Sequence, residues 1–247
     1  MRIDFSSLSR RRLLDMSRAG DQVLESFRVL GKAGANVVGQ VLKGEETFYE
    51  MDHYPPGDVY DDETHAQYYY HAHRPDSNEH GHFHTFLRAQ AIPEKVSPYP
   101  VSTEAKRPTG EDAICHLVAI SMDRSGLPIG LFATNRWVTD ETFYPAKDVI
   151  ALLDRFCIDH VYPCLATNQW VTAMIRLFRP QIEDLLRARD AKLLALEKAN
   201  PDTDVFEDRD IEVTSSVEID IDDQIEQVDL ALAAQREKER ARKAAAQ

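Results

Sequence analysis

Two short stretches decide the fold: residues 67–73 read Gln-Tyr-Tyr-Tyr-His-Ala-His, and residues 80–87 read His-Gly-His-Phe-His-Thr-Phe-Leu. Aromatic residues and threonine favour strands, and the connection Arg-Pro-Asp-Ser-Asn-Glu consists of residues that favour turns or loops. Alternate side chains of a strand share a face, so His71 and His73 point together, as do His80, His82 and His84. The two stretches therefore predict a β-hairpin over residues 64–88 with a histidine-rich face.

The register of this hairpin decides whether the histidines form one site. Pairing His73 with His80 sets His71 opposite His82 and places all five imidazoles on one face. Directly opposed Cβ atoms lie about 4.5 to 5.5 Å apart, which lets imidazoles converge on one metal ion. A shift by one residue would divide the histidines between the two faces. We prefer the first register because its other face carries a plausible core set: Tyr68, Tyr70, Ala72, Gly81, Phe83, Thr85 and Leu87.

The density of histidines in this region indicates a metal site. Seven of the nine histidines fall within residues 53–84. Neutral imidazoles suit Zn, Cu, Fe or Ni, whereas Mg and Ca prefer oxygen ligands. The candidate metal ligands are His71, His73, His80, His82 and His84. The accessory candidates are Glu79 as a carboxylate ligand or acid–base group, Asp76 in the same connection, and His116 as a further ligand.

The residues also allow two other interpretations of the histidine face. The imidazoles could form a structural or pH-sensitive polar face, because histidine titrates near neutral pH. They could also hold haem. Arg136 is a candidate contact for a substrate anion. Cys115 beside His116 suggests a thiol nucleophile, but neighbouring strand residues point to opposite faces, so this pair cannot exchange a proton directly.

Residues 5–200 are predicted to form a single α+β domain. Further strands are expected over residues 114–122 and 129–138, and the four strands form an antiparallel β-meander because no helix separates the members of either pair. Residues 47–63 and 89–111 are expected to be connections because they are rich in turn residues and proline.

Helices are expected to flank this sheet at both ends of the chain. The N-terminal helix covers residues 6–42, with a cap at Ser6 and Ser7 and a break near Gly31 and Gly34. Further helices begin at Pro145 and extend over residues 168–200, with a break at Pro180. The helices are expected on one face of the sheet and the histidines on the other.

Residues 201–247 differ in composition from the rest of the chain. Between Asp202 and Asp229 there are twelve acidic residues and one base, Arg209. This density predicts an acidic, partly disordered tail, with an edge strand of alternating Ile and Val as the alternative. Helical spacing from Ile221 predicts a terminal helix that docks on a protein partner, on a second copy or on the chain itself. A solvated tail with transient helicity is the alternative.

Composition limits the partners that this chain can bind. The net charge of −13 on 247 residues argues against nucleic acid or an anionic membrane. No stretch of about 18 uncharged apolar residues occurs, so no transmembrane span is expected. Three cysteines provide no disulfide framework and indicate a cytoplasmic protein. A small molecule is the expected ligand or substrate.

Two segments carry a resemblance to a known family: residues 53–58, His-Tyr-Pro-Pro-Gly-Asp, and residues 79–86, Glu-His-Gly-His-Phe-His-Thr-Phe. Together they resemble an uncharacterised bacterial family described only as a domain of unknown function. The resemblance covers roughly residues 45–190 and implies no activity. From the residues themselves we expect a metal-binding protein, with a non-haem metal-dependent oxidoreductase or hydrolase as the leading class. The alternative is a non-enzymatic interaction or sensor protein with a metal- or pH-responsive histidine face.

Overall fold

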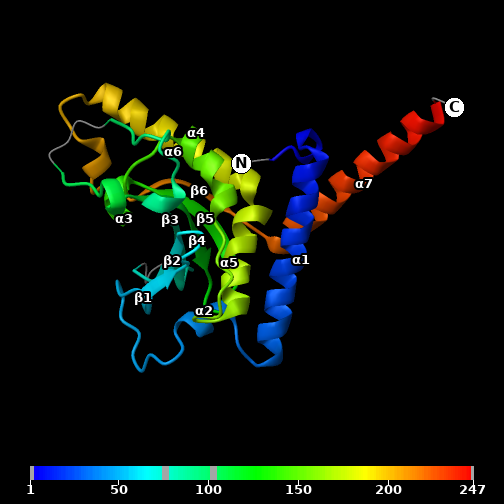
Figure 1. Cartoon of the computed structure of the whole chain (residues 1–247), viewed down its shortest axis with the longest axis horizontal. Helices are drawn as coiled ribbons and strands as arrows, with labels where there is room; N and C mark the ends of the chain where they lie inside the picture. The colour runs from blue at the N-terminus through cyan, green and yellow to red at the C-terminus, as the bar shows by residue number, and fades with distance from the viewer. Residues whose placement is uncertain (1–2, 74–77, 101–104, 246–247) are drawn as a thin grey trace.

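The architecture is α+β, a six-stranded antiparallel sheet with helices from both ends of the chain (Figure 1). The computed structural model describes residues 3–73, 78–100 and 105–245. The strands follow one another across the sheet in sequence order, which confirms the predicted meander and adds one strand at each edge. They are β1 (Tyr54–Tyr60), β2 (Ala66–His71), β3 (Gly81–Arg88), β4 (Ile114–Met122), β5 (Pro128–Thr134) and β6 (Val213–Glu218).

The longer helices are α1 (Arg10–Lys32), α5 (Leu165–Leu177), α6 (Arg179–Ala199) and α7 (Ile221–Ala245). Shorter helices are α2 (Val37–Val41), α3 (Arg136–Thr139) and α4 (Ala146–Leu152), and 3-10 turns are η1 (Phe5–Ser7), η2 (Ala89–Ala91), η3 (Gly110–Asp112), η4 (Leu153–Arg155) and η5 (Val205–Glu207). The predicted breaks near Gly34 and Pro180 are confirmed, since α1 ends at Lys32 and α5 ends at Leu177. The predicted cap is wrong: the side chain of Ser9, not of Ser6 or Ser7, accepts the hydrogen bond from the Arg12 amide.

The preferred hairpin register is confirmed within the paired residues. Tyr70 pairs with Phe83, and His71 pairs with His82. The ladder stops there, because β2 ends at His71 and β3 begins at Gly81. His80 instead donates its backbone amide to the carbonyl of Met122, at the end of the neighbouring strand β4.

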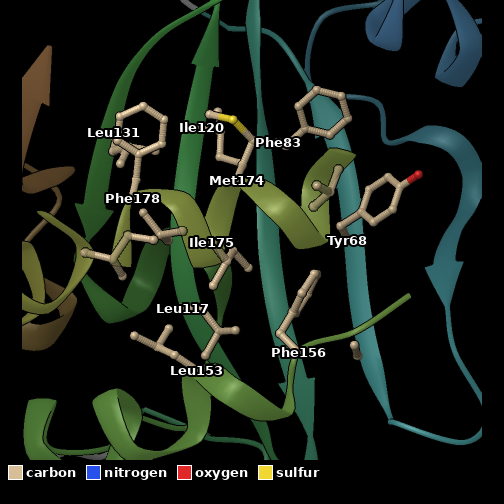
Figure 2. Close-up of a cluster of buried hydrophobic side chains, with 14 of the residues drawn as sticks. Tyr68, Phe83, Leu117, Ile120, Leu131, Leu153, Phe156, Met174, Ile175 and Phe178 are labelled. Carbon is tan, nitrogen blue, oxygen red and sulfur yellow. The ribbon is translucent and has the colours of Figure 1, made fainter. Parts of the chain in front are cut away.

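One face of the sheet packs against α5 and forms the main core (Figure 2). Tyr68, Phe83 and Ile120 are completely buried there, and so is Met174 of α5. The Tyr68 hydroxyl donates to Asn168 Oδ1 at 2.6 Å, which satisfies a polar group that burial would otherwise leave unpaired. Helix α1 lies outside α5 as a second layer (Figure 1).

A β-bulge between β3 and β4 determines which side chains face away from the helices. Thr85 pairs with Val118, but Phe86 pairs with His116, so Leu117 is the extra residue. Without this bulge Leu117 would fall opposite Phe86, and His116 would point into the apolar core. The bulge therefore moves His116 to the face that carries His82 and His84.

Strand β1 occupies a segment that the sequence predicts to be a loop, and this expectation is wrong. The prolines at positions 55 and 56 are tolerated because β1 is an edge strand, which needs hydrogen bonds on one side only. The register shifts between Tyr54 and Val59, and Gly57 and Asp58 adopt positive φ angles of 83° and 61°. Turn-forming residues thus produce an irregular edge strand that ends pairing on this side.

The C-terminal segment contributes one strand to the sheet and a helix whose first part packs against α1. Strand β6 pairs with β5, with Val217 opposite Leu131, so the edge-strand alternative applies to this part of the expected tail. Helix α7 packs against α1, where its Val228 and Leu232 form a buried cluster with Leu13 and Met16.

No helix among the described residues is long and apolar enough to cross a membrane.

Gly81 provides a test of this close packing at the start of β3. An added Cβ would lie 2.6 Å from the His71 carbonyl oxygen and 2.6 Å from the Tyr70 hydroxyl. We expect Gly81→Ala to lower the free energy of unfolding by about 1–3 kcal/mol, because backbone would have to shift. Urea denaturation in the presence of a chelator would measure this change.

Gly31→Ala is the matched control, since an added Cβ there meets no atom within 4 Å. Its last-turn position in α1 predicts unchanged or slightly increased stability, by up to about 1 kcal/mol. Equal stabilities for the two variants would contradict the close approach at Gly81.

Candidate metal centre

Three histidines bring ligand atoms together on the face of the sheet opposite α5. His71 ends β2, His82 lies in β3, and His73 follows β2 by two residues. One ring nitrogen of each lies within 4.8 Å of the others, an arrangement that could hold a metal ion. Nε2 of His71 and Nε2 of His82 are only 2.8 Å apart, with their rings nearly perpendicular at 84°.

Glu79 fixes the orientation of His82. Its Oε1 lies 2.6 Å from His82 Nδ1, and the His82 side chain is fully buried. A carboxylate accepts hydrogen bonds only, so Nδ1 carries the proton in this contact and Nε2 is left with its lone pair toward His71. A carboxylate behind a ligating imidazole is the usual partner that sets the tautomer at metal sites.

His73 lies at the edge of the cluster, where it is half-buried. Its Nε2 is 3.8 Å from Glu212 Oε1, a carboxylate that immediately precedes β6. The exposed fraction of the His73 side chain is 18%, against 0% for His82. The cluster therefore approaches solvent on the His73 side.

His84 and His116 form a second, deeper layer behind the three converging nitrogens. His84 Nδ1 lies 3.0 Å from His116 Nε2, and His116 Nδ1 lies 3.4 Å from the Thr134 hydroxyl. Burial lowers the pKa of His84 well below its ordinary value and lowers the pKa of His116 to about 3. Both imidazoles are therefore neutral at physiological pH. His84 Nε2 is buried and has no hydrogen-bond partner among the described residues.

The structure separates His80 from the cluster, so the expectation that all five histidines share one face is wrong. His80 Nδ1 lies 2.6 Å from the Tyr70 hydroxyl, and its ring stacks on Tyr70 and Phe48. The physical reason is that strand pairing stops at Gly81, the first residue of β3. His80 precedes the strand, so the alternation of strand side chains does not apply to it. The Tyr70 hydroxyl therefore binds the His80 imidazole on the side of the hairpin to which Tyr70 points.

Arg136 lies in a different polar cluster from the histidines. Its guanidinium is buried and binds Glu207, Asp140 at 3.0 Å and the carbonyl of Glu141 at 3.2 Å. These contacts neutralise the guanidinium, which gives it the features of a structural ion pair. Asp76, the other accessory candidate, lies outside the described residues.

Three residues near the site were not singled out from sequence. The ring of His53 stacks on Tyr69 with centroids 3.5 Å apart, and His53 Nδ1 lies 3.0 Å from Asp58 Oδ1. Glu212 comes from the C-terminal segment, whose composition gives no sign of contact with the hairpin. Glu141 follows α3, and its Oε2 accepts the backbone amide of His116 at 2.8 Å. Only His53 had a sequence signal, as part of the histidine-rich region.

Comparison with known proteins gives a family but no activity. A family model described as "Domain of unknown function (DUF6969)" matches residues 17–219. No curated protein matches the chain, and no solved structure matches it. The matched range begins inside α1 and ends directly after β6, so it includes the whole sheet and all three converging histidines.

Glu141 makes the stability of the fold depend on pH. Burial raises the pKa of Glu141 from 4.5 to about 7, although Arg189 acts in the opposite direction. The unfolded chain loses this proton near its ordinary pKa, and the folded chain keeps it until near pH 7. Stability is therefore lost as pH rises through this window, by about 1.4 kcal/mol for each unit of difference.

We expect Glu141→Gln to remove that contribution. The difference in unfolding free energy between the variant and the parent should grow from about pH 4.5 to about pH 7 and then level off. Urea denaturation across this pH range measures it. Glu111→Gln, at an exposed position in η3, serves as the control and should leave the pH dependence unchanged. A parallel pH profile for Glu141→Gln would show that the carboxyl titrates normally.

Proposed function

We propose that this chain, which belongs to the DUF6969 family of domains of unknown function, is a transition-metal-binding protein with His71, His73 and His82 as ligands. The observation that carries the proposal is the 2.8 Å separation of the His71 and His82 Nε2 atoms, with Glu79 behind His82. Zn, Fe, Cu and Ni are the ions that suit three neutral imidazoles.

The spacing of the nitrogens supports a single small ion. Two imidazole nitrogens that bind one tetrahedral zinc at about 2.0–2.1 Å lie about 3.3 Å from each other. The observed 2.8 Å therefore requires the rings of His71 and His82 to separate by only about half an ångström. The tautomer supports the same conclusion, since Glu79 leaves His82 Nε2 unprotonated.

The same spacing argues against a haem iron held between His71 and His82. Two imidazoles on opposite sides of one iron would place their nitrogens about 4 Å apart, twice a typical metal–nitrogen distance. His71 and His82 are closer than this and approach each other nearly at right angles. This geometry suits adjacent positions on one ion.

The number of ligands supports a catalytic role for the ion. Structural zinc sites have four protein ligands, whereas catalytic sites have three and keep a position for water or substrate. Among the residues that the structure describes, three histidines converge, and the half-buried His73 marks the side from which a small molecule would enter. A bound ion would lower the pKa of water or polarise a carbonyl in a hydrolase, or exchange electrons in an oxidoreductase. We therefore propose a metal-dependent enzyme of one of these two classes.

Metal analysis of protein purified without a histidine tag tests the site directly. We expect about one transition-metal ion per chain, and the identity of the ion will separate a redox-active from a redox-inactive centre. The double variant His71→Gln, His82→Gln should lose the metal while keeping its circular dichroism spectrum. The control His80→Ala should retain it, because His80 lies outside the cluster. Background metal in the parent, or full metal content in the double variant, would refute the proposal.

Glu79→Gln tests the carboxylate behind His82. Glutamine can still accept a hydrogen bond but lacks the negative charge that strengthens the imidazole as a ligand. We expect metal affinity to fall about 10–100-fold. Competition with a chromophoric chelator measures this, with Glu94→Gln at an exposed position as the control. Unchanged affinity in Glu79→Gln would mean that the carboxylate does not support the ligand.

A further inference from the structure

Helix α7 presents a line of exposed charged residues that the metal-centre proposal does not use. Its C-terminal half extends away from the body of the protein (Figure 1). The exposed residues follow one another at intervals of three or four, which keeps them on one side of the helix. We call this set the α7 stripe: Asp222, Glu226, Asp229, Ala233, Arg236, Arg240 and Lys243.

The charges of the α7 stripe are arranged in two opposite halves. The three residues before Ala233 are acidic, and the three after it are basic. Among the described residues, none of these six side chains has an ion-pair partner. The stripe is distinct from the face of α7 that carries Val228 and Leu232 and packs against α1.

The sequence of the stripe is complementary to itself in the antiparallel direction. Glu226 lies seven residues before Ala233, and Arg240 lies seven residues after it. Asp229 lies four residues before Ala233, and Arg236 lies three residues after it. If two copies of α7 pair antiparallel with Ala233 opposite Ala233, every acidic residue of one stripe faces a basic residue of the other. A two-fold axis requires such an isologous surface.

The shape of the surface around Ala233 would allow a second helix to approach closely. The acidic half borders a shallow, mainly apolar groove lined by Leu24 of α1 with Ile225 and Leu230 of α7. Leu24 and Leu230 are exposed, by 43% and 57% respectively. Ala233 also lines the groove, and its small side chain lets a second helix approach. The groove can therefore receive the alkyl parts of the basic side chains from a partner helix.

We propose that α7 is a self-association surface, on which a second copy of this chain pairs antiparallel about a two-fold axis beside Ala233. One helix pair with a narrow apolar border lies at the small end of protein interfaces, below about 1,200 Å² in total. The dimer should therefore dissociate on dilution. It should also weaken with salt, since the range of charge–charge attraction falls from about 8 Å at physiological ionic strength to about 3 Å at 1 M.

Charge reversal within the full-length chain tests the pairing, with sedimentation velocity over a concentration series as the readout. One variant carries Asp222→Lys, Glu226→Lys and Asp229→Lys, and the other carries Arg236→Glu, Arg240→Glu and Lys243→Glu. Each should raise the dimer dissociation constant at least about tenfold, because like charges then face each other. An equimolar mixture of the two variants should form a heterodimer. A chain carrying all six substitutions should regain the homodimer.

The six-substitution chain separates pairing from helix stability. It places basic residues at the start of α7 and acidic residues at its end, which the helix dipole disfavours. Restored association in this chain can therefore arise only from complementarity between two stripes. The control Lys238→Glu, Arg242→Glu changes the charge of the basic half on the other side of the helix and should leave the dimer intact.

Two results would overturn the proposal. One is a parent chain that stays monomeric throughout the concentration series at low salt. The other is a dimer whose dissociation constant is the same in the parent and in both charge-reversed variants. Metal content is independent of these measurements, so either outcome leaves the histidine site to be judged by its own test.

Discussion

The pairing of β2 with β3 is the contact on which both faces of the sheet depend. With Tyr70 opposite Phe83, the side chains of Tyr68, Tyr70 and Phe83 lie on the face that packs against α5 and are removed from water. Each such side chain contributes about 1.5–3 kcal/mol when fully buried. A shift of one residue would expose them and turn imidazoles into the apolar core. The hydrophobic core therefore also determines where His71 and His82 lie, because side chains alternate along a strand.

Burial of the histidine face is costly unless its polar atoms have partners. The chain meets much of this requirement internally, through Glu79 on His82 and through the contact between His84 and His116. The two Nε2 atoms of His71 and His82 face each other across 2.8 Å and can share only one proton between them. A metal ion would accept both lone pairs at once. The same short contact that permits a hydrogen bond between the two imidazoles therefore also suits two ligands of one ion.

The sequence predicts the regular parts of the fold and of the site, and it fails where regularity ends. The register and the positions of His71 and His82 follow from the two-residue period of strands. The position of His80 does not follow from this period, because strand pairing stops at Gly81 and the Tyr70 hydroxyl binds the His80 imidazole. The position of His116 depends on a bulge, which the strand pattern alone does not indicate. Prolines in β1 suggested a loop, since sequence does not distinguish an edge strand from a turn-rich connection.

The C-terminal segment shows a different limit, because composition says how much charge a segment has but not what that charge contacts. Its acidic residues predict a partly disordered segment, yet β6, which carries Val213 and Val217, pairs with β5. Some of the carboxylates then act locally, as Glu207 binds the buried Arg136 and Glu212 approaches His73. Helix α7 begins three residues after β6 ends. One short strand thus joins the edge of the histidine cluster to the charged stripe on α7, and much of the net negative charge of the chain belongs to folded structure.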